Sequence, residues 1–139
     1  MVLIMVTDCK GGVLFNGRRQ SRDVLLRQRI MEITKGQRLL VTPYSASQFS
    51  TEDQALLQVC SSPLDYASKE DFCFLEQVPD ANYNFSNVRN IVLFRWDREY
   101  PADCFFQVPK SNWVLRQSRE FSGFSHKRII EEVFENETK

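Results

Sequence analysis

The pattern that most constrains the fold of this chain is a set of short apolar runs separated by polar segments. Val2–Thr7 is apolar at almost every position, which is typical of a strand buried on both faces of a sheet. Three shorter runs have the same character: Arg38–Thr42, Leu56–Cys60 and Phe72–Leu75. Before them, Leu26, Ile30 and Ile33 recur at helical spacing and predict an amphipathic helix. This alternation predicts an α/β fold with parallel strands.

Turn and capping residues mark the ends of these early elements. Lys10-Gly11-Gly12 and Asn16-Gly17 are turn signals, so we expect a glycine-rich loop after the first strand. Ser21 is a suitable N-cap for the helix, with Asp23 in its first turn. Gly36 is placed to end it.

The middle and last thirds of the chain complete the predicted fold. Ser45 or Ser47 can cap a short helix over Gln48–Gln54. Longer strand-like segments then follow closely and should pair antiparallel: Asn90–Glu99, Trp113–Phe121 and Lys127–Phe134. We therefore predict a single domain over residues 1–139, with a mixed, mostly parallel sheet, antiparallel C-terminal strands and flanking helices. A chain of 139 residues can bury one core without a metal or disulfide.

Charge excludes some classes of protein and leaves two interpretations open. Eighteen basic residues balance eighteen acidic ones, which argues against a nucleic-acid coat and a charged disordered chain. Residues 10–38 nevertheless carry eight Lys or Arg against two acidic residues, and residues 51–88 carry one Lys against seven acidic residues. Either the two segments attract each other as solvated faces, or the basic one holds an anion.

The cysteines and the single histidine bear on compartment and metal binding. Cys9, Cys60, Cys73 and Cys104 lack CxxC spacing, which favours buried, reduced thiols and a cytoplasmic location. Polar residues interrupt the apolar start by Asp8, so neither a signal peptide nor a membrane span is expected. His126 is the only histidine, so no multi-histidine metal site can form and no metal is predicted.

Several segments together resemble the dihydrofolate reductase family over nearly the whole chain. Residues 3–17 (LIMVTDCKGGVLFNG) are similar to that family's first strand and the mobile loop after it, and Ser21-Arg22-Asp23 falls where its first helix begins. Residues 91–106 (IVLFRWDREYPADCFF), Trp113 and a final strand ending at Glu135 match later family segments in order and spacing. The resemblance implies a dihydrofolate reductase-like fold. Small bacterial proteins that carry the label ribonuclease Z are also similar, but that enzyme needs a histidine-rich two-metal site, which one histidine cannot supply.

The ligand-contacting segments of the reductase family are replaced in this chain. Arg18-Arg19-Gln20 stands where the family has a Pro-Trp pair, and Thr42-Pro43-Tyr44-Ser45 replaces its Gly-Arg-x-Thr segment. Glu76-Gln77 replaces a Gly-Gly pair that packs against cofactor phosphates, and Phe94 replaces a pteridine-contacting Thr. The chain is also short between its second strand and Glu76. We therefore expect no NADPH cofactor and no folate reduction.

A few residues remain as candidates for a site. Asp23 best matches the family's substrate carboxylate, although it could instead only complement the helix dipole. His126 could be a general base or an exposed turn residue. The remaining candidates are ligand-binding residues: Arg18, Arg19, Arg22, Tyr44 and Ser45.

Three functions follow from these residues. The first is a trimmed reductase scaffold that serves as a binding or interaction module, with a small anionic ligand and a second copy of itself as partners. The second is a divergent reductase for a pterin-like or nucleotide-derived ring, with Asp23 as proton donor or anchor. The third is metal-independent RNA binding or cleavage by the arginines and His126; the neutral net charge makes nucleic acid an unexpected partner.

Overall fold

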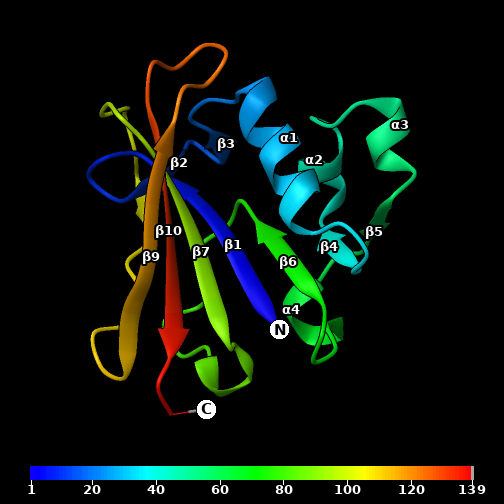
Figure 1. Ribbon diagram of the computed structural model, residues 1–139, viewed down its shortest axis with the longest axis vertical. Coiled ribbons are helices and arrows are strands. Elements are labelled where there is room, and N and C mark those ends of the chain that lie inside the picture. Colours follow the sequence, from blue (N-terminus) through cyan, green and yellow to red (C-terminus); the bar gives the residue numbers. More distant parts are fainter. Residues whose placement is uncertain (139) are drawn as a thin grey trace.

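A seven-stranded sheet forms the centre of the protein (Figure 1), as seen in a computed structural model that describes residues 1–138. Its strands lie in the order β5-β4-β6-β1-β7-β10-β9. Their bounds are β1 Val2–Thr7, β4 Leu39–Val41, β5 Leu57–Val59, β6 Phe72–Leu75, β7 Asn90–Trp96, β9 Trp113–Phe121 and β10 Ile129–Asn136.

Parallel pairing dominates this sheet, as predicted. β1 lies between β6 and β7 and is parallel to both, with Ile4 opposite Phe74 on one side and Val92 on the other. β4 continues the parallel part toward β5. β10 is antiparallel to β7 and β9 is antiparallel to β10, which confirms the mixed α/β sheet with antiparallel C-terminal strands.

The expected glycine-rich loop is instead part of a second, three-stranded sheet. β2 (Gly12–Phe15) pairs with β3 (Arg18–Arg19) on one side and β8 (Cys104–Phe105) on the other. Asn16 and Gly17 both have positive φ, 51° and 71°, and join β2 to β3. Asn-Gly between two short strands is a strong hairpin signal, because both turn positions need a left-handed backbone.

The helices differ from the predictions mainly at their caps. α1 (Val24–Ile33) begins after Asp23, which is the N-cap in place of Ser21. The single helix expected over residues 48–54 is wrong, because one four-residue helix ends before this range and another begins only at Thr51. Thr42 caps α2 (Pro43–Ala46) and Ser50 caps α3 (Thr51–Gln54). The remaining short elements are α4 (Pro63–Tyr66) and the 3-10 turn η1 (Phe85–Asn87).

Two apolar clusters cover the two faces of the main sheet. Val2 and Ile4 of β1 pack with Leu26 and Ile30 of α1 on one face. The alternate residues of β1, Leu3 and Met5, pack on the other face in the cluster that contains Phe106. β1 is therefore buried on both faces, as its continuous apolar run predicts.

The four cysteines differ in their exposure to solvent. All four cysteines are free, but only Cys73 is buried, whereas Cys9 is exposed and Cys60 and Cys104 are half-buried. The prediction of uniformly buried thiols is therefore wrong.

None of the helices within residues 1–138 is both long enough and apolar enough to span a membrane.

Candidate functional site

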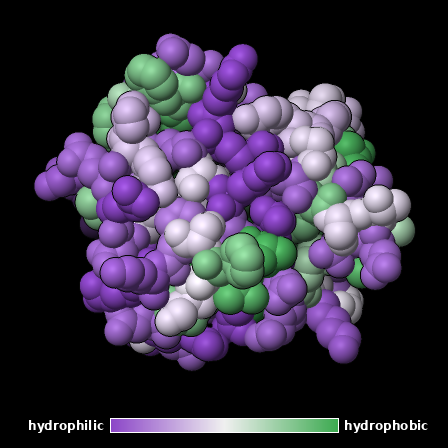
Figure 2. Space-filling view, turned by 90° about the horizontal axis from the view of Figure 1, so that it is seen from above, coloured by the Kyte–Doolittle hydropathy of each residue, from purple (hydrophilic) through white to green (hydrophobic). Residues whose placement is uncertain are grey.

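The carboxyl ends of the central strands are where α/β sheets ordinarily bind ligands. In this chain β1, β6 and β7 end there at Thr7, Leu75 and Trp96. Figure 2 looks onto this end of the molecule: hydrophilic side chains cover most of the view, and hydrophobic atoms gather in small patches. The side chains that fill this end therefore decide what it can bind.

An ion pair joins the segments that replace the family's ligand-contacting motifs. Arg19 of β3 donates from Nε to Glu76 Oε2 at 2.8 Å and from Nη2 to Glu76 Oε1 at 3.0 Å. The same Nη2 donates to the carbonyl of Tyr44 at 3.0 Å, and the guanidinium lies 4.2 Å from the centre of the Tyr44 ring. Burial opposes the charged guanidinium, but the hydrogen bonds and charge of Glu76 raise the pKa of Arg19 above its ordinary value.

This pairing leaves almost no space directly beneath it. The cavity beneath the pair has a volume of about 10 Å³, and Arg19, Ser21, Glu76 and Trp96 are among its lining residues. Such a cavity holds about one water molecule. Arg19 and Glu76 therefore fill this part of the carboxyl edge.

Asp23 and His126, the two candidates for catalysis, are in direct contact. His126 Nδ1 lies 2.9 Å from Asp23 Oδ2, and both residues are buried, with 6% and 2% of their surface exposed. The interpretation of His126 as an exposed turn residue is wrong. Its ring stacks on Trp96 with 4.0 Å between ring centres, and the loop between β9 and β10, which carries it, is hydrogen-bonded to Asp23 at the start of α1.

Both oxygens of the Asp23 carboxylate form hydrogen bonds within the protein. Oδ1 accepts from the backbone N–H groups of Leu25 at 2.9 Å and Phe124 at 2.9 Å, and Oδ2 accepts from Ser125 N at 2.8 Å. Burial favours the neutral acid, but these hydrogen bonds and the one from His126 outweigh it, so the pKa of Asp23 lies well below its usual range. Asp23 therefore caps α1, as the helix-dipole interpretation suggested, and also ties the β9–β10 loop to that helix.

Two hydroxyl groups share the other nitrogen of His126. Nε2 lies 3.1 Å from Ser21 Oγ and 2.9 Å from Tyr100 OH. Ser21, His126 and Asp23 thus have the connectivity of a nucleophile, a base and an orienting acid. Ser21, however, borders a cavity of about 10 Å³, which has no room for a substrate carbonyl. We refer to Ser21, Asp23, Tyr100 and His126 as the Asp23–His126 cluster.

Asp8 is a further buried carboxylate that the sequence analysis did not single out. It follows β1 and accepts from Gly12 N at 2.8 Å, Tyr100 N at 3.1 Å and Gln20 Nε2 at 2.9 Å. Burial again opposes ionisation, and the hydrogen bonds lower the pKa of Asp8 below its ordinary value. The sequence signal that could have identified Asp8 is its position directly after a buried strand and before Gly11-Gly12. Asp8 fixes the β2–β3 hairpin against the segment that carries Tyr100.

An open pocket of about 480 Å³ lies beside this hairpin, and we call it the hairpin pocket. Its lining residues include Phe15, Asn16, Arg18, Gln20 and Tyr100. The Arg18 side chain is exposed and has no ion pair or hydrogen bond with any residue from 1 to 138. Arg18 is therefore the free cation of this pocket.

The remaining ligand-binding candidates lie apart from the hairpin pocket. Arg22 is exposed and does not line it. Tyr44 contacts Arg19 through its ring and accepts a hydrogen bond from Arg19 N at its hydroxyl. Ser45 is fully buried and donates its backbone N–H to Thr42 Oγ1, so it belongs to the cap of α2. Within residues 1–138 no three His, Cys, Asp or Glu side chains gather as a metal site would require.

The strand order, the parallel centre and the antiparallel C-terminal strands define a mixed α/β protein. Among solved structures, the chain is similar to dihydrofolate reductase from Enterococcus faecalis complexed with NADP(H) and RAB-propyl. The TM-score is 0.63 and the identity 11%, over 96% of this chain and 94% of the reductase. The fold is therefore that of a divergent dihydrofolate reductase-like protein. Neither models of protein families nor curated proteins match the sequence.

Proposed function

We propose that this chain is a binding module for a small anionic ligand, built on a dihydrofolate reductase-like scaffold whose carboxyl edge is closed. The proposal rests on the different environments of two neighbouring arginines. Arg19 is ion-paired with Glu76, whereas Arg18 is unpaired and lines an open pocket of about 480 Å³. That volume is within the range of small-molecule sites.

The chemistry of the hairpin pocket favours an anion with a planar or apolar body. The Arg18 guanidinium can donate two parallel hydrogen bonds to a carboxylate or phosphate. Phe15, which is 45% exposed, and Tyr100 offer ring surfaces to the rest of the ligand. Asp8 and the positive-φ turn hold the hairpin in place, so little ordering is required on binding.

The other two functions receive less support from the geometry. A reductase that uses Asp23 as donor needs that carboxylate to reach a substrate, but its side chain is fully buried. RNA cleavage by His126 meets the same difficulty, because only 4% of its side chain is exposed. Both groups would have to leave their present partners first.

The test is a comparison of ligand binding by matched arginine variants. Calorimetric titration with inorganic phosphate, adenosine monophosphate, folate and NADPH should reveal binding that Arg18→Ala weakens about tenfold or more, as expected for a lost charged hydrogen bond. Arg22→Ala is the control, because Arg22 is an exposed arginine outside the pocket. Equal affinities in the two variants, or turnover of dihydrofolate with NADPH, would overturn the proposal.

A further inference from the structure

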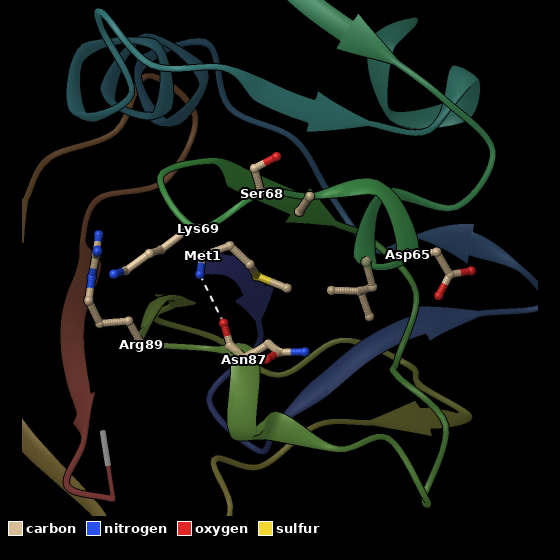
Figure 3. Close-up of a pocket in the computed structure, with 8 residues that line it drawn as sticks. Met1, Asp65, Ser68, Lys69, Asn87 and Arg89 are labelled. Atoms are coloured by element: carbon tan, nitrogen blue, oxygen red, sulfur yellow. Dashed lines mark hydrogen bonds between the residues drawn. The ribbon is translucent and has the colours of Figure 1, made fainter.

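A further cavity lies at the opposite end of the main sheet from the hairpin pocket. Its volume is about 710 Å³, and it opens where β1, β6 and β7 begin (Figure 3). One wall is the segment from Leu64 to Lys69, and the other is the segment that carries Asn87 and Arg89. We call it the amino-edge pocket. Its volume suits a small molecule.

One end of the amino-edge pocket is basic. Figure 3 shows Lys69 and Arg89 reaching the same side of the cavity from its two walls. Lys69 is exposed and has no ion pair or hydrogen bond with the residues that the structure describes. Arg89 donates from Nε to Asn90 Oδ1 at 3.3 Å, and its Nη1 has a loose contact of 3.9 Å with Glu70 Oε2, between exposed side chains. Such surface pairs contribute little, so the positive charge is available to a ligand.

The side chains of Met1, Leu64 and Ala67 give the same pocket an apolar surface, and the Met1 amino group donates to the Asn87 carbonyl at 2.9 Å. Met1 is buried, and Leu64 and Ala67 pack against the core cluster to which it belongs. Asp65 lines the pocket at some distance from the two cations and points away from them in Figure 3. The lining therefore combines a basic end with a hydrophobic surface.

Both walls are held in place before any ligand binds. Asp71 accepts a hydrogen bond from Ser68 N at 2.7 Å and one from Arg38 Nε at 3.1 Å, which orders the loop that carries Lys69. On the other wall, Arg89 N donates to the Met1 carbonyl at 2.9 Å. Preformed walls lower the entropic cost of binding.

From these observations we infer that the amino-edge pocket is a second ligand site, which takes an amphipathic anion. Lys69 and Arg89 bind its carboxylate or phosphate head, and Met1, Leu64 and Ala67 contact its apolar part. The site is independent of the hairpin pocket, because the two share no lining residue and lie at opposite ends of the sheet.

The test uses octanoate and octyl phosphate as probes, each titrated below the concentration at which it forms micelles. We expect amide shifts in two-dimensional NMR spectra to concentrate at residues 64–69 and 87–89. 1-Octanol lacks the anionic head group and inorganic phosphate lacks the apolar chain, so each should bind at least about tenfold more weakly than the two probes. A preference for octyl phosphate would identify a phosphate ester as the natural head group, and a preference for octanoate a carboxylate.

Charge-reversal variants test whether binding depends on the basic end of this pocket. Lys69→Glu should weaken binding of both anionic probes about tenfold, whereas Lys35→Glu, an exposed lysine in the turn after α1, should leave it unchanged. Arg18→Ala should also leave the affinity for both probes unchanged. The proposal for the hairpin pocket and the proposal for the amino-edge pocket can therefore fail separately. Equal binding by Lys69→Glu, shifts centred elsewhere, or no binding of either probe would overturn the inference.

Discussion

Replacing Asp23 by Asn tests whether the Asp23–His126 cluster holds the β9–β10 loop to α1. The Asn carbonyl can still accept from Leu25 N and Phe124 N, but its amide would face Ser125 N–H and His126 Nδ1. Two buried groups would then lack their acceptor, at about 1–3 kcal/mol each. We expect a loss of about 3–5 kcal/mol in the free energy of unfolding, out of roughly 5–15 kcal/mol for a domain of ordinary stability.

Urea unfolding of the wild type and of Asp23→Asn at several pH values measures this effect. With a slope of about 1–3 kcal/mol per molar urea, the midpoint at pH 7 should fall by more than about 1 M. The pKa of Asp23 is lower in the folded state than in the unfolded chain, so its stabilisation is complete above the ordinary Asp value of about 4 and is lost as pH falls below it. The variant should therefore lose less stability than the wild type between about pH 4 and pH 2. Asp80→Asn, at an exposed carboxylate, is the control. An unchanged midpoint and an unchanged acid slope for Asp23→Asn would refute the reasoning.

Three further predictions follow from neighbouring contacts. Glu76→Gln should destabilise the protein by about 1–3 kcal/mol, because it leaves the half-buried Arg19 guanidinium without its carboxylate; an unchanged urea midpoint would show that the pair contributes nothing. Gly123→Ala should cost about 1–3 kcal/mol, since an added Cβ would lie 2.6 Å from an oxygen of the capping carboxylate, and a neutral effect would mean that the loop moves freely. Iodoacetamide should modify the exposed Cys9 first and leave Cys73, whose pKa burial raises to about 12, unmodified in the native state; mass spectrometry showing early Cys73 labelling would contradict this.

The fold was predictable because its signals are local and redundant. The apolar run of β1 predicts burial on both faces, and the closely spaced C-terminal segments predict antiparallel pairing. The errors arose where two local signals compete. Ser21 and Asp23 can both cap a helix, and only the loop around Phe124 decides in favour of Asp23, because its N–H groups need the same carboxylate.

The site was less predictable because its contacts join residues that are far apart in the sequence. Nothing near His126 indicates that its partners are Ser21 and Tyr100, or that Trp96 will cover its ring. The prediction that the basic and acidic segments attract each other agrees better with the structure. Arg19 and Arg38 of the basic segment pair with Glu76 and Asp71 of the acidic one, so the attraction inferred from composition is present in two ion pairs.

Arg19 and Glu76 at the carboxyl edge depend on each other. Arg19 alone would be a half-buried charge without a partner, and Glu76 alone would be the same with the opposite sign. Together Arg19 and Glu76 satisfy each other and fill the space between them. Glu76→Gly alone would therefore leave Arg19 unpaired. The space between Arg19 and Glu76 is closed to a ligand, whereas the hairpin pocket and the amino-edge pocket are open.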